Sequence, residues 1–207
     1  KDLGDVRMGA RRSPYLGEWG ELTHYVDQIN GVDTTLLNEN ALIQKNTGYR
    51  QMDILQKFRY TPSQYVDWIL NMQYSTSSDV DRLDKLNDYS GENLKYASYY
   101  YGPQNRWFVS LKNVLKKDNR IFTNMTTIVA FQKIDEDRIT RKFSVDDKLF
   151  QQEDVFVYSA TFDFTRLITK GQRLIYGLEV NHNDVRSSAR YENIIDGSIS
   201  EALTRYP

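Results

Sequence analysis

The chain has 207 residues, with 27 lysines and arginines against 28 aspartates and glutamates, so its formal net charge at pH 7 is −1. This balance gives no strong electrostatic field, which argues against nucleic acid as a partner. The sequence contains no cysteine, and this excludes disulfide frameworks, thiolate metal sites and cysteine nucleophiles.

The sequence has no run approaching the ~18 apolar residues that a membrane-spanning helix requires. A membrane-spanning strand needs only about ten residues, of which every second one faces lipid, so a β-barrel is not excluded. Aromatic residues make up 13% of the chain, and 15 of them are tyrosines. Tyrosine and tryptophan suit the boundary between an apolar layer and water.

Residues 1–48 lack a sustained alternation, and we expect a loop or barrel-entry segment there. The first clear strand covers 49–60, where apolar side chains occupy most even positions and polar ones most odd positions. The apolar positions include Met52, Ile54, Phe58 and Tyr60. A turn is predicted near 61–64, because Pro62 lacks a backbone donor and presets the turn conformation.

The returning strand covers 66–75 and alternates almost perfectly. One face carries Val66, Trp68, Leu70, Met72 and Tyr74, whereas the other carries an acidic residue and two amides. Such an apolar face packs on a second sheet in a soluble sandwich and meets lipid in a membrane barrel.

Two further hairpins repeat the alternation, at 107–131 and 156–182. Their turns are predicted near 116–121 and 169–172. Long charged loops are predicted between and after the hairpins, near 76–106, 134–154 and 186–207. Because short turns at one rim and long loops at the other are typical of outer-membrane barrels, we expect an all-β fold of that kind. In it, residues 49–207 form a partial antiparallel up-and-down transmembrane β-barrel of about six strands.

Six strands are too few to close a lipid-facing barrel, since bacterial single-chain barrels begin at about eight. An open sheet in lipid would leave backbone groups unpaired along both edges. We therefore expect the chain to be part of a longer barrel. The lack of a secretion signal at 1–5, which an outer-membrane protein requires, agrees with this expectation.

Five sequence motifs fall in the predicted loops and at strand ends. They are GARRSPYLGEWG at 9–20, QKNTGY at 44–49, QYSTSSD at 73–79, YYYGPQNR at 99–106 and EDRITR at 136–141. Together they resemble the barrel region of TonB-dependent outer-membrane receptors of the Bacteroidetes type. The resemblance extends over almost the whole chain.

The resemblance implies a role in the bacterial outer membrane. Receptors of this family hold an N-terminal plug inside a barrel of about 22 strands. They import scarce nutrients, namely iron chelates, cobalamin, glycans or peptides, with energy from the TonB system. The implied partners are a TonB-type energy-coupling protein acting through the plug, an extracellular nutrient ligand, outer-membrane lipid and a surface lipoprotein. No plug or coupling box is recognised in this sequence, and the resemblance does not specify the ligand.

Aromatic side chains in an outer loop can bind ligands. Tyr99, Tyr100, Tyr101 and Trp107 lie in or beside the long loop near 76–106, and we predict that they contact the ligand. Their rings would stack on a sugar or a planar chelate, with large contact area at low entropic cost. The alternative is that they pack the loop on itself or form an aromatic girdle.

Two groups of charged loop residues are further candidate ligand sites. Asp79, Asp81 and Asp84 have a spacing that can hold Ca²⁺, but they lack the glycine and the later glutamate of an EF-hand. Four arginines suit acidic ligands or lipid phosphates, because guanidinium binds those groups with two hydrogen bonds. These are Arg11, Arg12, Arg138 and Arg141. For both groups the preferred interpretation is charges that are solvated or paired within the loops.

The sequence offers no catalytic constellation. His24 and His182 are its two histidines, and neither has a neighbour at metal-ligand spacing. No nucleophile elbow, phosphate loop or matched carboxylate pair is recognised. We therefore expect no enzymatic activity, no cofactor and no metal.

Two alternatives share most of these features. A passive outer-membrane porin has the same wall without a plug. A soluble all-β carbohydrate-binding module would use the tyrosine-rich segment as its binding face. The receptor is the leading interpretation because it also accounts for the loop motifs.

Overall fold

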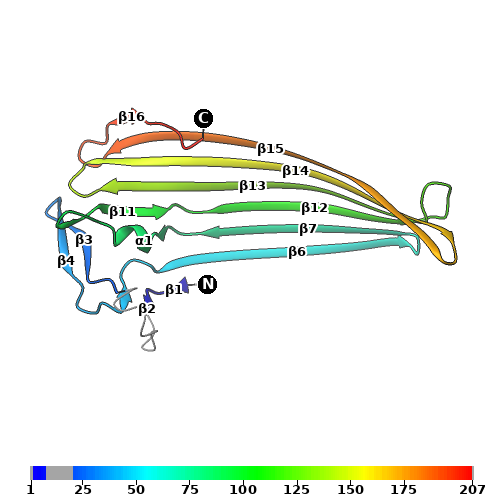
Figure 1. Ribbon diagram of the computed structural model, residues 1–207, viewed down its shortest axis with the longest axis horizontal. Coiled ribbons are helices and arrows are strands. Elements are labelled where there is room, and N and C mark those ends of the chain that lie inside the picture. Colours follow the sequence, from blue (N-terminus) through cyan, green and yellow to red (C-terminus); the bar gives the residue numbers. More distant parts are fainter. Residues whose placement is uncertain (1, 8–20, 207) are drawn as a thin grey trace.

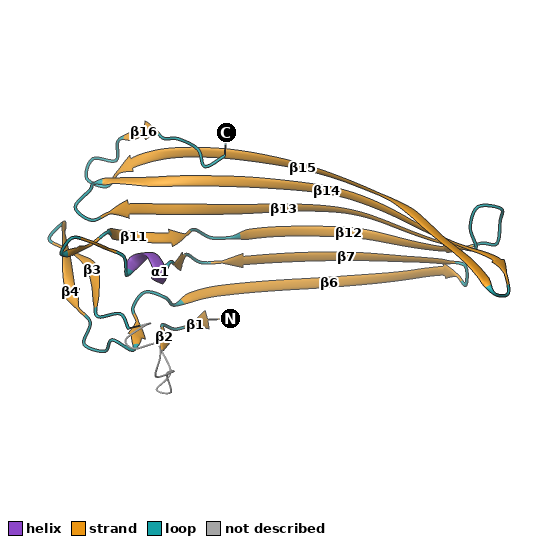
Figure 2. Ribbon diagram, viewed as in Figure 1, coloured by secondary structure: helices purple, strands orange, loops and turns teal. Residues whose placement is uncertain are grey.

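The computed structural model describes residues 2–7 and 21–206. Its main body is one large antiparallel sheet, in which consecutive long strands lie side by side (Figures 1 and 2). The long strands are β6 (Tyr49–Ser63), β7 (Val66–Ser77), β12 (Asn105–Lys116), β13 (Asn124–Lys142), β14 (Asp147–Thr169) and β15 (Gln172–Asn193). The predicted all-β class and the large antiparallel sheet are therefore confirmed.

Shorter strands extend this sheet or form small hairpins. At its edges, β1 (Asp2–Leu3) pairs with β6 and β16 (Ile199–Glu201) pairs with β15. Strand β11 (Tyr96–Tyr101) pairs with β13 and with β8 (Val80–Asp81). The small hairpins are β2 (Val6–Arg7) with β5 (Ile43–Gln44), β3 (His24–Ile29) with β4 (Val32–Leu37), and β9 (Tyr89–Ser90) with β10 (Asn93–Leu94).

Helical structure is limited to a single turn. Among the described residues, α1 (Leu83–Leu86) is the one helix. Nothing helical in the described ranges is long and apolar enough to cross a membrane.

The two ends of the sheet differ in construction. The short connections 64–65, 117–123 and 170–171 gather at one end, which we call the turn end (Figure 1). The β3–β4 hairpin, α1, β11 and β16 gather at the opposite end, which we call the loop end (Figure 1). Residues 24–37, within the segment expected to be a loop or barrel entry, thus form a hairpin, whereas 9–20 lie outside the described residues.

The sequence predicts a long loop near 134–154, and the structure shows this prediction to be wrong. Strands β13 and β14 continue through the segment, and only 143–146 connect them. Charged residues occupy both faces here, with Asp135 opposite Asp154 and Glu136 opposite Glu153. The apolar–polar alternation therefore disappears although the backbone pairing continues. Strand structure also enters the other two predicted loops, through β8 to β11 within 76–106 and through β15, which continues to Asn193.

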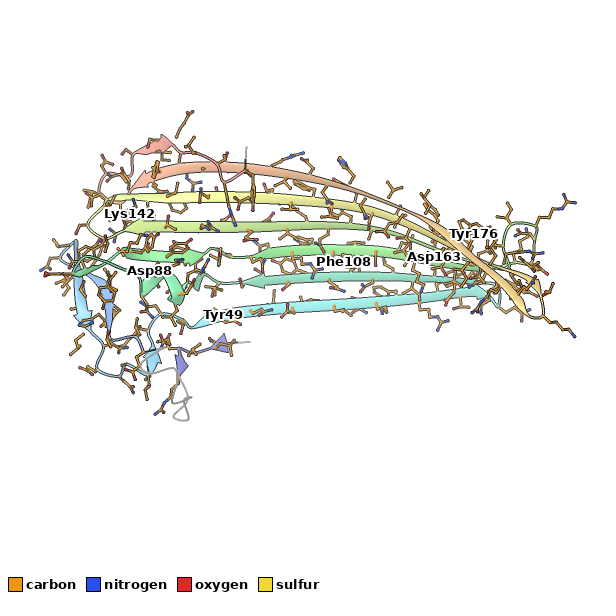
Figure 3. All side chains as sticks on the ribbon, in the orientation of Figure 1. Tyr49, Asp88, Phe108, Lys142, Asp163 and Tyr176 are labelled. Atoms are coloured by element: carbon orange, nitrogen blue, oxygen red, sulfur yellow. The ribbon has the colours of Figure 1, made fainter. Side chains whose placement is uncertain are left out.

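Buried apolar side chains occur only at the loop end of the described chain. They are Leu22, Leu94, Tyr99 and Ile139. Along the rest of the sheet, side chains project from both surfaces without a second layer over them (Figure 3). The sheet therefore lacks the internal core that a soluble sandwich would have.

A buried ion pair attaches the β3–β4 hairpin to the sheet. The Arg141 guanidinium donates to both carboxylate oxygens of Asp33 over 2.6 and 2.8 Å, and the two side chains are 8% and 2% exposed. The backbone N–H of Ser144 adds a third hydrogen bond to Asp33 over 2.9 Å. Burial alone would raise the pKa of Asp33, but the hydrogen bonds from Arg141 and Ser144 outweigh it and hold that pKa below its usual range.

Removing one member of this pair should release the hairpin. We expect Asp33→Ala to destabilise the docking of β3–β4 by about 3 kcal/mol, because Arg141 is left buried without its counterion. Hydrogen–deuterium exchange of residues 24–37 measures this opening. Asp27→Ala on the exposed side of β3 is the control, and equal acceleration of exchange in both variants would contradict the anchoring role.

A second prediction concerns the close approach of β15 to β14. A Cβ on Gly177 would lie 2.5 Å from the backbone oxygen of Phe162, whereas nothing lies within 4 Å of a Cβ on Gly171. We expect Gly177→Ala to destabilise the sheet by about 1–3 kcal/mol, because the backbone must shift. Chemical denaturation compares it with Gly171→Ala, which should be near neutral. Similar losses in both variants would show that the contact at Gly177 is relaxed without cost.

Candidate functional site

The long strands present two chemically different faces. Residues that are paired across antiparallel strands point to the same side of a sheet, so the observed register carries one face across all six strands. The apolar face comprises even positions of β6, β7, β14 and β15 and odd positions of β12 and β13. We call the opposite side the polar face.

Four consecutive rows of paired residues cross the apolar face of the described sheet without an aspartate, glutamate, lysine or arginine. The row nearest the turn end is Val66, Leu115, Met125, Phe164 and Tyr176. The next is Tyr60, Trp68, Asn113, Thr127, Phe162 and Leu178, followed by Phe58, Leu70, Leu111, Val129, Ala160 and Val180. The fourth is Gln56, Met72, Val109, Phe131, Tyr158 and His182. We call these rows the apolar belt.

The apolar belt is exposed to its surroundings. Phe58 is 53% exposed and Leu178 is 61% exposed, and both lie in its middle rows. A contiguous exposed apolar surface of this kind marks a site of interaction with a membrane or with another protein. Over the same length, the polar face carries six ionisable side chains, namely Lys57, Arg59, Asp67, Lys112, Asp163 and Glu179. The two faces therefore suit two different media.

The loop-end border of the apolar belt runs obliquely across the strands. Apolar residues continue to Met52 on β6, to Trp107 on β12 and to Phe156 on β14, but only to Phe131 on β13 and to Val180 on β15. Measured between the outermost strands, β6 and β15, the border moves by three rows across five steps. This is about 20 Å along the strands against about 24 Å across them. The strands are therefore inclined by about 40° to the direction in which the belt is stacked.

Aromatic rings lie along this border. The rings of Tyr74 and Trp107 have centroids 4.4 Å apart, and those of Phe131 and Tyr158 are 5.2 Å apart. Phe156 is the last apolar residue of this face on β14, and the Lys133 ammonium and the Arg186 guanidinium lie over its ring at 5.7 and 5.0 Å. Tyrosine and tryptophan rings, and rings with a cation over their face, are typical of the edge of an apolar layer.

The four predicted ligand residues lie on different faces. Strand pairing places Tyr99 and Tyr101 on the polar face, and Tyr100 and Trp107 on the side of the apolar belt. Trp107 is half exposed at the border of the apolar belt, which is where the alternative prediction of an aromatic girdle would place it. Ligand contact by these residues stays a prediction, but they do not form one cluster.

Two of these tyrosines are tied into the loop end. Tyr99 is 8% exposed, and its ring meets that of Tyr96 edge-on at 5.1 Å. The hydroxyl of Tyr101 accepts a hydrogen bond from Arg82 over 2.7 Å, and the Arg82 guanidinium lies 5.4 Å from both the Tyr99 and Tyr101 rings. These contacts hold α1 and β11 together.

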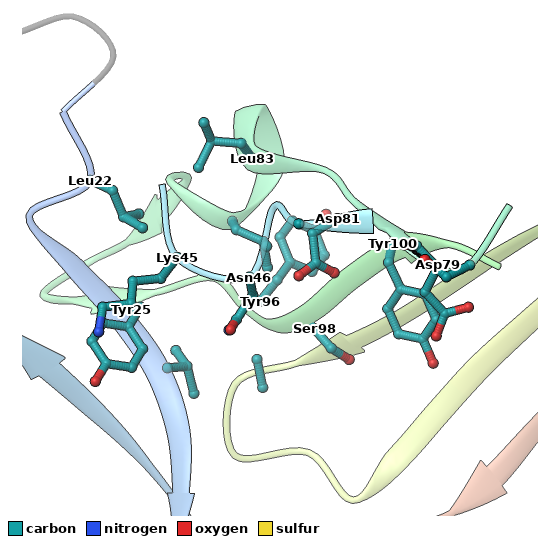
Figure 4. A pocket seen from close by; sticks show the side chains of 15 residues that line it. Leu22, Tyr25, Lys45, Asn46, Asp79, Asp81, Leu83, Tyr96, Ser98 and Tyr100 are labelled. Atoms are coloured by element: carbon teal, nitrogen blue, oxygen red, sulfur yellow. Dashed lines mark hydrogen bonds between the residues drawn. The ribbon is translucent and has the colours of Figure 1, made fainter. Parts of the chain in front are cut away.

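Tyr100 lines a pocket of about 530 Å³ at the loop end (Figure 4). Residues of β3, β8, β11 and α1 surround this pocket, together with Lys45 and Asn46. The rings of Tyr25 and Tyr96 and the carboxyl groups of Asp79 and Asp81 also line it (Figure 4). We call it the β8 pocket.

Asp81 is the most perturbed acid of the β8 pocket. Burial, reinforced by the negative charges of Asp79 and Asp5, raises the pKa of Asp81 to about 6. Asp84 does not join these acids, because Arg82 donates to its carboxylate over 2.8 Å. No group of three or more histidines, aspartates or glutamates in the described ranges is arranged to hold a metal ion.

The raised pKa of Asp81 gives the β8 pocket a definite pH dependence. The folded carboxyl keeps its proton to higher pH than the unfolded one, so its stabilising contribution is complete below about pH 4 and is lost as pH rises through about 6. Hydrogen exchange in β8 and β11, corrected for the intrinsic rate, should therefore be faster at pH 8 than at pH 5. Asp81→Asn should remove this difference. A wild-type protein with equal protection at both pH values would contradict the assignment.

The remaining candidates fall in separate places. His24 lies within 3.1 Å of the Thr23 hydroxyl and 3.3 Å of the Tyr89 hydroxyl. His182 lies in the fourth row of the apolar belt, with its ring 6.2 Å from that of Tyr158. Arg141 is paired with Asp33, as the pairing interpretation expects, whereas Arg11 and Arg12 lie outside the described residues.

Comparison with known proteins adds no family assignment. No protein-family model matches the chain, and no curated protein matches its sequence. The receptor resemblance therefore depends on the five loop motifs alone.

Proposed function

We propose that the chain forms part of the wall of a bacterial outer-membrane β-barrel, with the apolar belt facing lipid and the polar face lining the interior. The supporting observation is the apolar belt itself, which is exposed and free of ionised side chains through four rows. Its inclination of about 40° matches the 35–45° tilt of strands in membrane barrels. A soluble module gives no reason for such an oblique uncovered band.

The extent of the apolar belt also fits a membrane. Along β7, apolar residues alternate without interruption from Val66 to Tyr74, which is about 27 Å of strand. At a tilt of about 40° this length covers about 20 Å of membrane thickness, and side chains at both ends extend it. Outer-membrane barrels have an apolar band about 25 Å tall.

The edges of the sheet require further strands in such an environment. On its outer edge β6 pairs only with the two residues of β1, and β15 only with the three residues of β16, within the described chain. Unpaired backbone groups are too costly in lipid to remain open. In the proposed barrel, additional strands continue the sheet beyond β6 and β15 until it closes.

The receptor role is the second step of the proposal. The loop motifs resemble TonB-dependent receptors, and the loop end carries the β3–β4 hairpin and the connecting segments at which such a receptor would meet its ligand. The imported nutrient would be an iron chelate, cobalamin, a glycan or a peptide. The partners would be a TonB-type energy-coupling protein acting through a plug, and a surface lipoprotein.

The lipid-facing assignment predicts unequal effects at two adjacent residues. Leu70 lies in the middle of the apolar belt and Asn71 on the polar face of the same strand. We expect Leu70→Arg to destabilise the folded barrel in lipid by about 2–4 kcal/mol, and Asn71→Arg to cost much less. Reversible unfolding in phospholipid vesicles measures both values. Equal losses would mean that the two faces are assigned wrongly.

Two experiments separate the alternatives. If the chain folds cooperatively as a monomer in water without detergent, the soluble carbohydrate-binding module is favoured and the membrane proposal is refuted. Nutrient uptake in cells that lack the energy-coupling protein separates the receptor from the porin. In those cells, uptake should be abolished if the chain belongs to a receptor and unchanged if it belongs to a porin.

A further inference from the structure

A second cavity, of about 460 Å³, lies on the polar face at the loop end. It is lined by Tyr96, Tyr99, Arg138, Thr140, Lys142, Val145, Asp147, Leu149, Gln151 and Tyr191. We call it the Arg138 pocket. The β8 pocket is separate, because Tyr100 and Asp81 lie on the other side of the sheet.

Strand register builds the floor of the Arg138 pocket from two adjacent rows. One row runs from Tyr99 through Thr140 and Leu149 to Tyr191, across β11, β13, β14 and β15. In the next row Arg138 stands between Tyr101 and Gln151. The rings and Leu149 thus form an apolar surface directly beside the Arg138 guanidinium and the neutral polar side chains of Thr140 and Gln151.

The Arg138 guanidinium has no counterion in the described chain. Its Nε atom is buried and makes no hydrogen bond, and the Tyr101 ring lies 6.0 Å from the guanidinium carbon. A buried guanidinium N–H without an acceptor carries a desolvation cost that a bound acceptor would remove. Arg138 therefore has unused capacity for a ligand acceptor.

The side chains that line the Arg138 pocket include two cations and one carboxylate. Lys142 adds a second cation, and the one carboxylate of the lining, Asp147, already accepts a hydrogen bond from Asn193 over 3.0 Å. Glu153 lies close enough to attract Arg138 but forms no ion pair with it, and burial raises the pKa of Glu153, which disfavours its charged form. An anionic group is therefore the ligand group that this pocket lacks.

We propose that the Arg138 pocket binds a carboxylate carried on an aromatic or apolar body. Arg138 would receive the carboxylate through two parallel hydrogen bonds, with Thr140 and Gln151 beside it. Tyr99, Leu149 and Tyr191 would contact the body of the ligand, where tyrosine rings give large contact area. That such a molecule is transported rests on the proposed function, because the polar face then lines the barrel interior, but the binding itself does not.

A matched pair of probes tests the charge requirement. N-acetylphenylalanine carries the carboxylate and the ring, whereas N-acetylphenylalanine amide has the same body without the charge. Isothermal titration of the full-length protein in detergent should show the acid binding at least tenfold more tightly than the amide. Equal affinities, or no binding of the acid at millimolar concentration, would overturn the proposal.

A matched pair of variants tests the residue. Arg138→Gln should weaken binding of the acid at least tenfold and leave the amide unchanged. Arg106→Gln removes the same charge from the polar face outside the pocket, where Arg106 donates to Gln132, and should leave both affinities unchanged. Retained preference for the acid in Arg138→Gln would refute the assignment, and thermal unfolding checks that this variant is folded.

Two further outcomes distinguish this proposal from its neighbours. If phenyl phosphate binds through Arg138 and the carboxylate does not, the ligand class proposed here is wrong and a phosphate replaces it. A protein found to be soluble would overturn the membrane proposal, and the same titration in water would still decide the Arg138 pocket.

Discussion

Backbone pairing between β6, β7, β12, β13, β14 and β15 determines which side chains share a face. Once Phe58 is paired with Leu70, each further step through Leu111, Val129 and Ala160 to Val180 follows from the register. A slip of one residue in β6, β7, β12, β14 or β15 would place charged residues of the polar face in the apolar belt. The belt, its oblique border and the pockets at the loop end all depend on this register.

Sequence alone predicts the part of the sheet where the two faces meet different media. From Val66 to Tyr74 the alternation is visible because one face is apolar and the other polar, and the structure pairs these residues as expected. From 134 to 154 both faces are polar, so period-two patterning carries no information although β13 and β14 stay paired. The backbone hydrogen bonds of this segment do not require alternating side chains, so the sequence does not indicate them.

The candidate sites were less predictable for a different reason. Tyr99 and Tyr100 are neighbours in sequence, but a strand sends them to opposite faces. An irregular register between Tyr96 and Ser98 brings Tyr96 to the same face as Tyr99. The pair Asp33 and Arg141 joins residues separated by 108 positions. Arg138 and Tyr191 share a pocket only because β13, β14 and β15 run side by side. Such contacts are properties of the sheet order, and no local pattern reports them.

The length of the long strands has a consequence for access from outside the cell. With 23 residues, β14 is about 75 Å long, and the apolar belt occupies only about a third of it. In the proposed barrel, with the loop end outward, residues 147–157 of β14 would extend beyond the membrane and carry the loop end clear of the lipid head groups. In that barrel the β3–β4 hairpin and the turn at 143–146 would be accessible to molecules that do not reach the membrane surface itself.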